Sequence, residues 1–235
     1  MRRPTLDQTT HSRFASCSLQ HHELQDALLI VDLQEDFLPP NGSLAVSGGR
    51  DIVPVINSLL ASPLFDVKVA TKDWHPADHI SFAANHPNRT IGRSNSYETR
   101  LWPVHCVQGT PGARLVPELD VDKVDKIIEK GQDKRVEMYS AFADPFENPR
   151  VAQSELQGYL KEQSVGKVYV VGLAMDYCVK ATAEDAAKEG FTTFIIEDAT
   201  KAQAEMQGRG IKFVGAKTFQ FKFSVVVSAS KDLYL

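Results

Sequence analysis

Four side chains that could take part in nucleophilic catalysis stand directly after short apolar runs of the chain. They are two carboxylates, an amine and a thiol: Asp32, Asp73, Lys130 and Cys178. In an open α/β sheet, ligands bind beyond the carboxyl ends of the strands. One polar residue at such an end is usually solvated or caps a helix, but four at matching ends predict a shared catalytic site.

Cys178 is the most informative of the four, because the segment that follows it, residues 179–188, favours a helix. A thiol at the start of a helix lies near the positive end of the helix dipole, and a nearby Lys ammonium adds to this, so we expect a lowered thiol pKa. The free amides of the same turn can bind an oxyanion. The alternative is a small buried hydrophobic residue, which is how we interpret Cys106 and Cys17.

Asp32 is the expected proton carrier for this thiol. Burial at a strand end raises the pKa of a carboxylate, whereas a neighbouring Lys130 ammonium lowers it. A Cys–His pair stays open as an alternative, although the histidines lie either near the N-terminus or in a long loop.

The loop histidines indicate a metal site. Asp73, His75 and His79 place a carboxylate and two imidazoles close together, and His105 is a more distant candidate. Two or three imidazoles plus a carboxylate suit Zn²⁺, Fe²⁺ or Mn²⁺. Because histidines are common in loops, the spacing alone favours a metal only slightly.

Short β-branched runs alternate with helical patterns along the chain. Such crossovers are typical of a parallel sheet covered on both faces, so the fold class is α/β: a three-layer α/β/α domain with a mostly parallel, about six-stranded sheet. The predicted strands are Ala27–Leu33, Asp66–Thr71, Lys126–Glu129, Lys167–Gly172, Thr192–Ile196 and Ile211–Val214. The predicted helices are Gly49–Ala61, Pro149–Gln163, Tyr177–Glu189 and Ala202–Gly208. Trp74–Pro117, rich in His, Pro, Asn and Gly, is predicted to be a functional loop.

The composition of the chain limits the classes of partner and the compartment that we expect. The 235 residues include 26 basic and 30 acidic side chains, a formal net charge of −4 that excludes a nucleic-acid binder on bulk charge. Apolar runs are shorter than the roughly 20 residues of a membrane span, so we expect no membrane partner. Three cysteines make a poor disulfide framework and favour a reducing compartment. We expect a cytoplasmic protein, with a nuclear or peroxisomal share left open.

The two ends of the chain differ from its middle. We interpret residues 1–26 as a disordered N-terminal extension without a secretory signal and residues 27–216 as the α/β domain. In residues 217–235, three phenylalanines alternate with polar residues, which indicates an added strand. That strand could be a contact in a homo-oligomer or an aggregation-prone arm.

Five segments resemble, in order, the motifs of the nicotinamidases, a group within the isochorismatase-like cysteine hydrolases. The segments are LIVDLQEDF (29–37), TKDWHPADH (71–79), LWPVHCVQGT (101–110), EKG (129–131) and GLAMDYCV (172–179). The resemblance implies the isochorismatase-like fold and the hydrolysis of nicotinamide to nicotinate and ammonia. It also implies that the analogue pyrazinamide is often accepted.

The resemblance further implies the roles of the reactive residues. Cys178 would be the nucleophile, Asp32 the proton carrier and Lys130 the charge that keeps the site competent for thiolate formation. The amides of Ala174 and Cys178 would form the oxyanion hole, after a cis peptide bond between Leu173 and Ala174.

The resemblance also implies the ligands of one divalent metal ion, with zinc the first expectation and iron or manganese the alternatives. Asp73, His75 and His105 would bind it, and His79 would bind directly or through water. This ion would orient the pyridine nitrogen of the substrate. An aromatic set would hold the ring: Phe37 and Trp102 on its two faces, with Tyr139 nearby. Ordinary core packing would satisfy the first two rings equally well.

Two other functions compete with this one. A related amidohydrolase that acts on N-carbamoyl compounds would share the Asp, Lys and Cys residues but lack the metal ligands. A non-catalytic α/β module would bind a metal or a partner protein through the His-rich loop.

Overall fold

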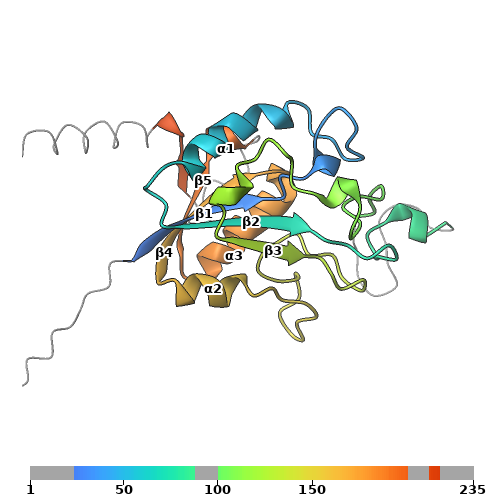
Figure 1. Cartoon of the computed structure of the whole chain (residues 1–235). Helices are drawn as coiled ribbons and strands as arrows, with labels where there is room; N and C mark the ends of the chain where they lie inside the picture. Colours follow the sequence, from blue (N-terminus) through green and yellow to red (C-terminus); the bar gives the residue numbers. More distant parts are fainter. Residues whose placement is uncertain (1–23, 88–99, 201–211, 218–235) are drawn as a thin grey trace, which may run out of the picture.

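The protein is described from a computed structural model that covers residues 24–87, 100–200 and 212–217. Its centre is a sheet of six parallel strands, which confirms the predicted fold class (Figure 1). In chain order the strands are β1 (Gln25–Val31), β2 (Val67–Asp73), β3 (Lys126–Lys130), β4 (Val165–Gly172), β5 (Thr192–Ile196) and β6 (Lys212–Val214). Across the sheet the order is β3-β2-β1-β4-β5-β6. The four strands that precede the reactive side chains are therefore neighbours.

The helices cover the two faces of the sheet (Figure 1). They are α1 (Val53–Leu60), α2 (Leu156–Glu162) and α3 (Lys180–Lys188). A 3-10 turn (Gly49–Ile52) leads into α1, and a π-helical turn (Met175–Val179) leads into α3. Further 3-10 turns are Glu35–Phe37, Ala83–Asn85, Pro111–Ala113, Val121–Lys123 and Glu197–Ala199.

Successive side chains of β1 point to opposite faces of the sheet and so belong to two separate halves of the core. Leu28 and Ile30 pack with α1 on one face, whereas Leu29 and Val31 pack with α2 and α3 on the other. All four side chains are fully buried. A strand that is apolar on both faces is expected for a parallel sheet between two helical layers. These two cores hold the carboxyl ends of the strands in place.

One predicted helix is wrong in its first half. Residues 149–155 form a loop, because the buried Asp144 carboxylate accepts hydrogen bonds from the amides of Phe146, Val151 and Ala152. The helix starts only after Ser154, whose hydroxyl oxygen accepts the Leu156 amide. The predicted helix at residues 202–208 and the predicted extensions at residues 1–23 and 218–235 lie outside the described residues. β1 begins at Gln25, two residues before the predicted start of the domain.

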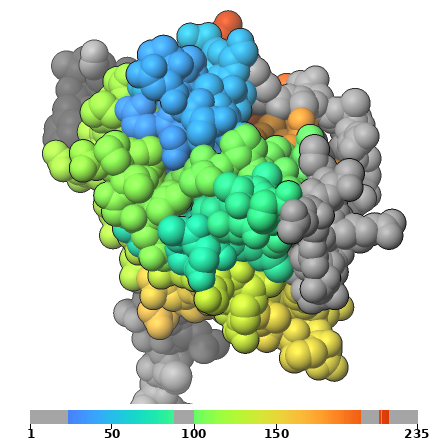
Figure 2. Space-filling model, turned by 90° about the vertical axis from the view of Figure 1, so that its right-hand side faces the viewer, coloured from blue at the N-terminus to red at the C-terminus, as the bar shows by residue number. Residues whose placement is uncertain are grey.

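No helix among the described residues is long and apolar enough to cross a membrane. Figure 2 looks onto the carboxyl ends of the strands, where loop segments from the teal and green parts of the sequence form much of the surface. These segments belong to the loop that was predicted to be functional.

Candidate active site and metal centre

The Lys130 ammonium lies at the centre of a buried cluster. Its Nζ is 3.0 Å from Asp32 Oδ2, 2.5 Å from Asp73 Oδ1 and 3.5 Å from Cys178 Sγ. It also donates a hydrogen bond to the carbonyl of Met138 at 3.3 Å. Sheet register brings these groups together, because Asp73 is paired with Lys130 between β2 and β3 and the Asp32 amide donates to Thr71 on β2. The structure thus unites the four residues singled out at the strand ends.

Two groups of this cluster, Lys130 and Asp73, stay charged, whereas Asp32 can gain or lose a proton. Burial lowers the pKa of Lys130, but Asp32 and Asp73 outweigh it and raise that pKa well above its ordinary value. Burial raises the pKa of Asp73, but Lys130 and His75 outweigh it and hold that pKa far below its ordinary value. For Asp32, burial raises the pKa, Lys130 lowers it and Asp73 raises it, with a net upward shift. Asp32 is therefore the carboxylate best able to accept a proton.

The lowered thiol pKa expected for Cys178 is wrong in direction. Burial raises the pKa of Cys178 well above its ordinary value; Lys130 lowers it, while Asp32 and Asp73 raise it further. Cys178 lies inside the π-helical turn, and α3 begins at Lys180. A carboxylate oxygen of Asp32 lies within 4.8 Å of the Cys178 sulfur, so this carboxylate is close enough to serve as the acceptor of the thiol proton.

Asp32 has a left-handed backbone conformation, with φ of 49°. Such a conformation is uncommon for a residue other than glycine, although Asp tolerates it better than most. Next to it, Gly172 at the end of β4 has φ of 118°, and a Cβ there would lie 2.1 Å from the carbonyl oxygen of Val31. Only glycine allows β1 and β4 to approach this closely just before the turn that carries Cys178.

The predicted cis peptide bond between Leu173 and Ala174 is wrong. Among the described residues the cis bonds are Pro39–Pro40 and Asn148–Pro149, where proline reduces the preference for trans. Ala174 is extended, and its carbonyl accepts the amides of Tyr177 and Val179 on either side of the nucleophile. The oxyanion hole formed by the amides of Ala174 and Cys178 stays a prediction.

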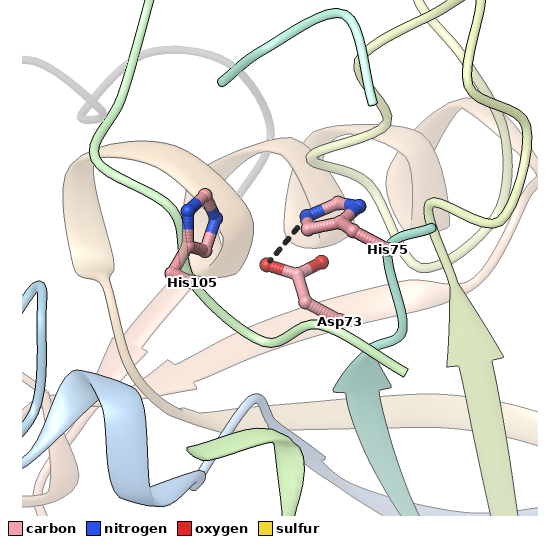
Figure 3. A group of neighbouring side chains, drawn as sticks. All are labelled: Asp73, His75 and His105. Atoms are coloured by element: carbon pink, nitrogen blue, oxygen red, sulfur yellow. Dashed lines mark ion pairs between the residues drawn. The ribbon is translucent and has the colours of Figure 1, made fainter. Parts of the chain in front are cut away.

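Asp73, His75 and His105 form the candidate metal centre (Figure 3). One ligand atom from each lies within 4.8 Å of the others, and all three residues are buried. Asp73 ends β2, whereas the two imidazoles come from the loop, and Asp73 Oδ2 lies 3.7 Å from His75 Nε2. Three side chains from two segments of the chain, residues 73–75 and residue 105, therefore gather around one small volume.

The hydrogen bonds of the two imidazoles leave one lone pair on each for a metal. His75 Nδ1 donates to the Gly131 carbonyl at 2.8 Å, and His75 Nε2 is buried without a hydrogen-bond partner. His105 Nδ1 donates to the Pro103 carbonyl at 2.8 Å. Backbone carbonyls commonly fix metal-binding histidines in this way. The donor set, one carboxylate and two imidazoles, fits a divalent transition metal.

Gly131 is required for this arrangement. It has φ of 68°, and a Cβ at this position would lie 2.4 Å from Cε1 of His75. Any side chain there would displace the imidazole from this position. The glycine of the EKG motif therefore connects the amine of the catalytic cluster to the metal ligand.

His79 lies beside the metal centre but outside the group of three. Its Nδ1 accepts the Ser81 hydroxyl at 2.8 Å and its Nε2 donates to the Val136 carbonyl at 3.1 Å, so both nitrogens are bonded to protein. The ring stacks on that of His75, with centroids 4.2 Å apart. Burial, followed by His75, lowers the pKa of His79 to about 3. In this position a neutral His79 supports the His75 ring.

The predicted pocket aromatics fall into two groups. Phe37 packs against the metal-site ring of His105, with centroids 5.6 Å apart. Trp102 Nε1 donates to the Tyr139 hydroxyl at 2.9 Å, and its ring meets the edge of Tyr177, the residue before the nucleophile, at 5.0 Å. One group thus lies beside the candidate metal centre and the other beside Cys178.

Several residues that support the site were not singled out from the sequence. The Thr71 hydroxyl donates to Asp32 Oδ1 at 2.7 Å, and the Gln34 side chain bonds both the amide and the carbonyl of Asp73 at 2.8 Å. The carboxylate of Glu137 is buried near His75 and raises the pKa of that imidazole. Gln34 and Thr71 had a signal, since they lie within the LIVDLQEDF and TKDWHPADH segments, whereas Glu137 had none.

Comparison with known proteins identifies the relatives of this chain. The isochorismatase domain family matches residues 26–214. The nicotinamidase of Acinetobacter baylyi is 47% identical over 180 residues, which cover 75% of this chain and 81% of that protein. The nicotinamidase of Saccharomyces cerevisiae is 38% identical over 190 residues, which cover 74% of this chain and 87% of that protein.

Solved structures agree with these relatives. The Acinetobacter baumanii nicotinamidase/pyrazinamidase has a TM-score of 0.75 and 39% identity, covering 84% of this chain and 99% of that chain. The L. infantum protein PnC1 in complex with nicotinate has a TM-score of 0.71 and 34% identity, covering 82% and 93%. The Pyrococcus horikoshii pyrazinamidase in complex with zinc has a TM-score of 0.63 and 37% identity, covering 81% and 99%. The chain therefore belongs to the isochorismatase family, and its relatives place it among the nicotinamidases.

Proposed function

We propose that this protein is an amidohydrolase that converts nicotinamide to nicotinate and ammonia. The observation that carries the proposal is the buried cluster of Asp32, Lys130 and Cys178, joined through Asp73 to a metal-ligand group. An N-carbamoyl amidohydrolase would need only the cluster of Asp32, Lys130 and Cys178 and not the metal-ligand group. The relatives that cover most of the chain, at 38–47% identity, are nicotinamidases.

In the first half of the reaction, Asp32 accepts the thiol proton of Cys178 while the sulfur attacks the carboxamide carbon. The raised pKa of Asp32 suits it to hold this proton. The oxyanion that develops would be bound by the amides of Ala174 and Cys178. Asp32 then donates the proton to the amide nitrogen, the C–N bond breaks, and ammonia leaves a thioester on the enzyme.

In the second half, water attacks the thioester and Asp32 accepts a proton from it. The C–S bond breaks, nicotinate is released, and the proton returns to Cys178. Lys130 stays protonated throughout, because its raised pKa keeps it charged between the two carboxylates. It stabilises the thiolate whenever the thiol proton rests on Asp32.

One divalent ion, zinc in our proposal with iron or manganese as alternatives, would be held by Asp73, His75 and His105. When bound, it supplies a Lewis acid that can hold the pyridine nitrogen and so orient the ring. Phe37, Trp102 and Tyr139 would hold the faces of the ring, since flat heteroaromatics pack well between offset aromatic side chains. Pyrazinamide, which keeps a nitrogen at the same ring position, should also be accepted.

The decisive experiment measures ammonia release from nicotinamide before and after removal of metal with a chelator. We expect turnover to be lost on chelation and restored by zinc, iron or manganese, and the extent of recovery shows which ion is most effective. Elemental analysis of the purified protein identifies the ion that it carries. Turnover of N-carbamoylsarcosine that resists chelation, with no ammonia from nicotinamide, would support the metal-free alternative instead. Absence of both activities, with Cys178 inert to iodoacetamide, would support the non-catalytic module.

A further inference from the structure

Arg100 joins the long loop to the turn that carries the nucleophile. Its Nη1 donates a hydrogen bond to the hydroxyl of Tyr177, which is 77 residues away in the sequence and adjacent to Cys178. The guanidinium carbon lies 4.6 Å from the centroid of the Trp102 ring and 5.7 Å from that of Tyr177. One exposed cation thus contacts two aromatic rings, of which Tyr177 belongs to the turn that carries Cys178 and Trp102 packs against Tyr177.

The backbone of Trp102 is held independently of Arg100. Its amide donates to the Ser81 carbonyl at 2.7 Å, and its carbonyl accepts the Ala83 amide at 2.8 Å. These bonds set the path of the chain but leave the indole free to rotate about its side-chain torsions. Side-chain contacts therefore decide which way the half-buried ring faces.

Three side chains restrict the Trp102 indole. Tyr139 accepts its Nε1–H at 2.9 Å, and Tyr177 meets it edge to face at 5.0 Å and 88°. Tyr139 and Tyr177 also contact each other, with centroids 5.5 Å apart. The exposed Arg100 also contacts both Trp102 and Tyr177, so it and the half-buried Tyr139 each link the two rings. We call Arg100, Trp102, Tyr139 and Tyr177 the aromatic clasp.

We infer that Arg100 is a positioning residue that sets substrate affinity by holding the Trp102 and Tyr177 rings as one rigid wall. It touches none of the reacting atoms. A ring that is already ordered does not have to be immobilised when the substrate binds. The entropy cost that is avoided in this way increases the affinity for the substrate. The inference rests on the proposed function, because it concerns the same pocket.

The kinetic test uses Arg100→Ala, Arg100→Lys and Tyr177→Phe. We expect Arg100→Ala to raise KM for nicotinamide about 2- to 10-fold, the saving expected for one immobilised side chain, with kcat within about 2-fold. Arg100→Lys keeps a charge over the ring but loses the planar stack and the fork of donors, so its KM should be intermediate. Tyr177→Phe keeps the ring and removes the hydrogen-bond acceptor, and its effect should be smaller in the Arg100→Ala background than alone.

The second readout is independent of turnover. The chain has two tryptophans, so Trp74→Phe leaves Trp102 as its one indole fluorophore. In that background, Arg100→Ala should lower the fluorescence anisotropy of Trp102 and increase its quenching by acrylamide. The matched control is Arg150→Ala, which removes an exposed arginine far along the chain and should change neither reading.

The outcomes separate the inference from the proposed function. An unchanged KM together with unchanged Trp102 fluorescence in Arg100→Ala would overturn the inference. Equal losses of kcat, metal content and melting temperature in all three variants would assign Arg100 a merely structural role, which also overturns it. If the parent protein releases no ammonia from nicotinamide, the proposed function fails, while the fluorescence of Trp102 still decides whether the clasp exists.

Discussion

The two halves of the candidate site are built in different ways. Asp32 and Lys130 lie at the carboxyl ends of β1 and β3, which flank β2, and sheet register brings their side chains to within 3.0 Å of each other. His75, His105 and Trp102 come from the long loop, and single hydrogen bonds to Gly131, Pro103 and Tyr139 orient their rings. The catalytic half is thus part of the folded core, whereas the metal and aromatic half is attached to it.

Asp73 belongs to both halves, because it pairs with Lys130 and lies beside His75. The difference implies that removing a buried charge from the catalytic half should affect chemistry and folding together. Changes in the loop half should affect metal or substrate binding while the fold persists. Four substitutions test this distinction, and their expected effects decrease in the order given below.

Replacing the nucleophile should have the largest effect on turnover. Cys178→Ala removes the attacking sulfur, so we expect kcat to fall by about 10⁴-fold or more. The fold and the metal content should be unchanged, because the substitution removes one buried atom without leaving a charge unpaired. Ammonia release and elemental analysis measure the two quantities. Turnover at even a few per cent of the parental rate would reject Cys178 as the nucleophile.

Replacing the central cation should damage stability as well as activity. Lys130→Met leaves Asp32 and Asp73 buried without their counter-ion, which we expect to cost about 3–5 kcal/mol of unfolding free energy. Urea unfolding of the metal-free protein measures this. His105→Ala is the comparison from the loop half, and it should cost less than about 1.5 kcal/mol in the same metal-free state. Equal losses for the two variants would contradict the proposed division of the site.

Displacing a metal ligand through its glycine neighbour should weaken metal binding selectively. Gly131→Ala introduces a Cβ that collides with His75, and we expect zinc affinity to fall about 10- to 100-fold. Competition with a chromophoric chelator measures that affinity. The control is Gly158→Ala in α2, where a Cβ would meet nothing within 4 Å, and its zinc affinity should match the parent. Unaltered zinc binding in Gly131→Ala would show that the His75 ring does not depend on this glycine.

The smallest effect concerns the proton carrier. Thr71→Val removes the hydroxyl that donates to Asp32, and this bond stabilises the ionised carboxylate. Its loss raises the pKa of Asp32 further, so the acidic limb of the kcat/KM profile should move to higher pH, by about half a unit. The shift is toward higher pH because the activity requires ionised Asp32. A limb that stays in place or moves to lower pH would exclude Asp32 as the group that titrates there.

Some properties of the site could be inferred from local pattern. Asp32, Asp73 and Lys130 follow buried apolar runs, and parallel strands bring their carboxyl ends to one edge, so their proximity followed from strand prediction alone. The motifs around His75 and His105 named two members of the candidate metal centre. The segment after Cys178 placed it near a helix start, although it did not reveal the intervening π-helical turn.

Other properties depended on contacts between distant segments. The direction of the Cys178 pKa shift follows from a sum of burial, one ammonium and two carboxylates, none of which is adjacent in the chain. His79 matched the metal motif, yet hydrogen bonds to Ser81 and to the carbonyl of Val136 occupy both of its nitrogens. The carbonyl of Met138, which binds Lys130, carries no side-chain signature at all.

Residue order along the chain was enough to specify the α/β architecture, the edge of the sheet that carries the chemistry and the identity of its reactive groups. These depend on hydrophobic periodicity and on strand direction, which are local properties of the chain. Folding in three dimensions decided the protonation state of Cys178, the tautomers of His75 and His105 and the joining of Arg100 to Tyr177. Those depend on desolvation and on distances between groups remote in sequence, because electrostatic and hydrogen-bond energies follow spatial separation.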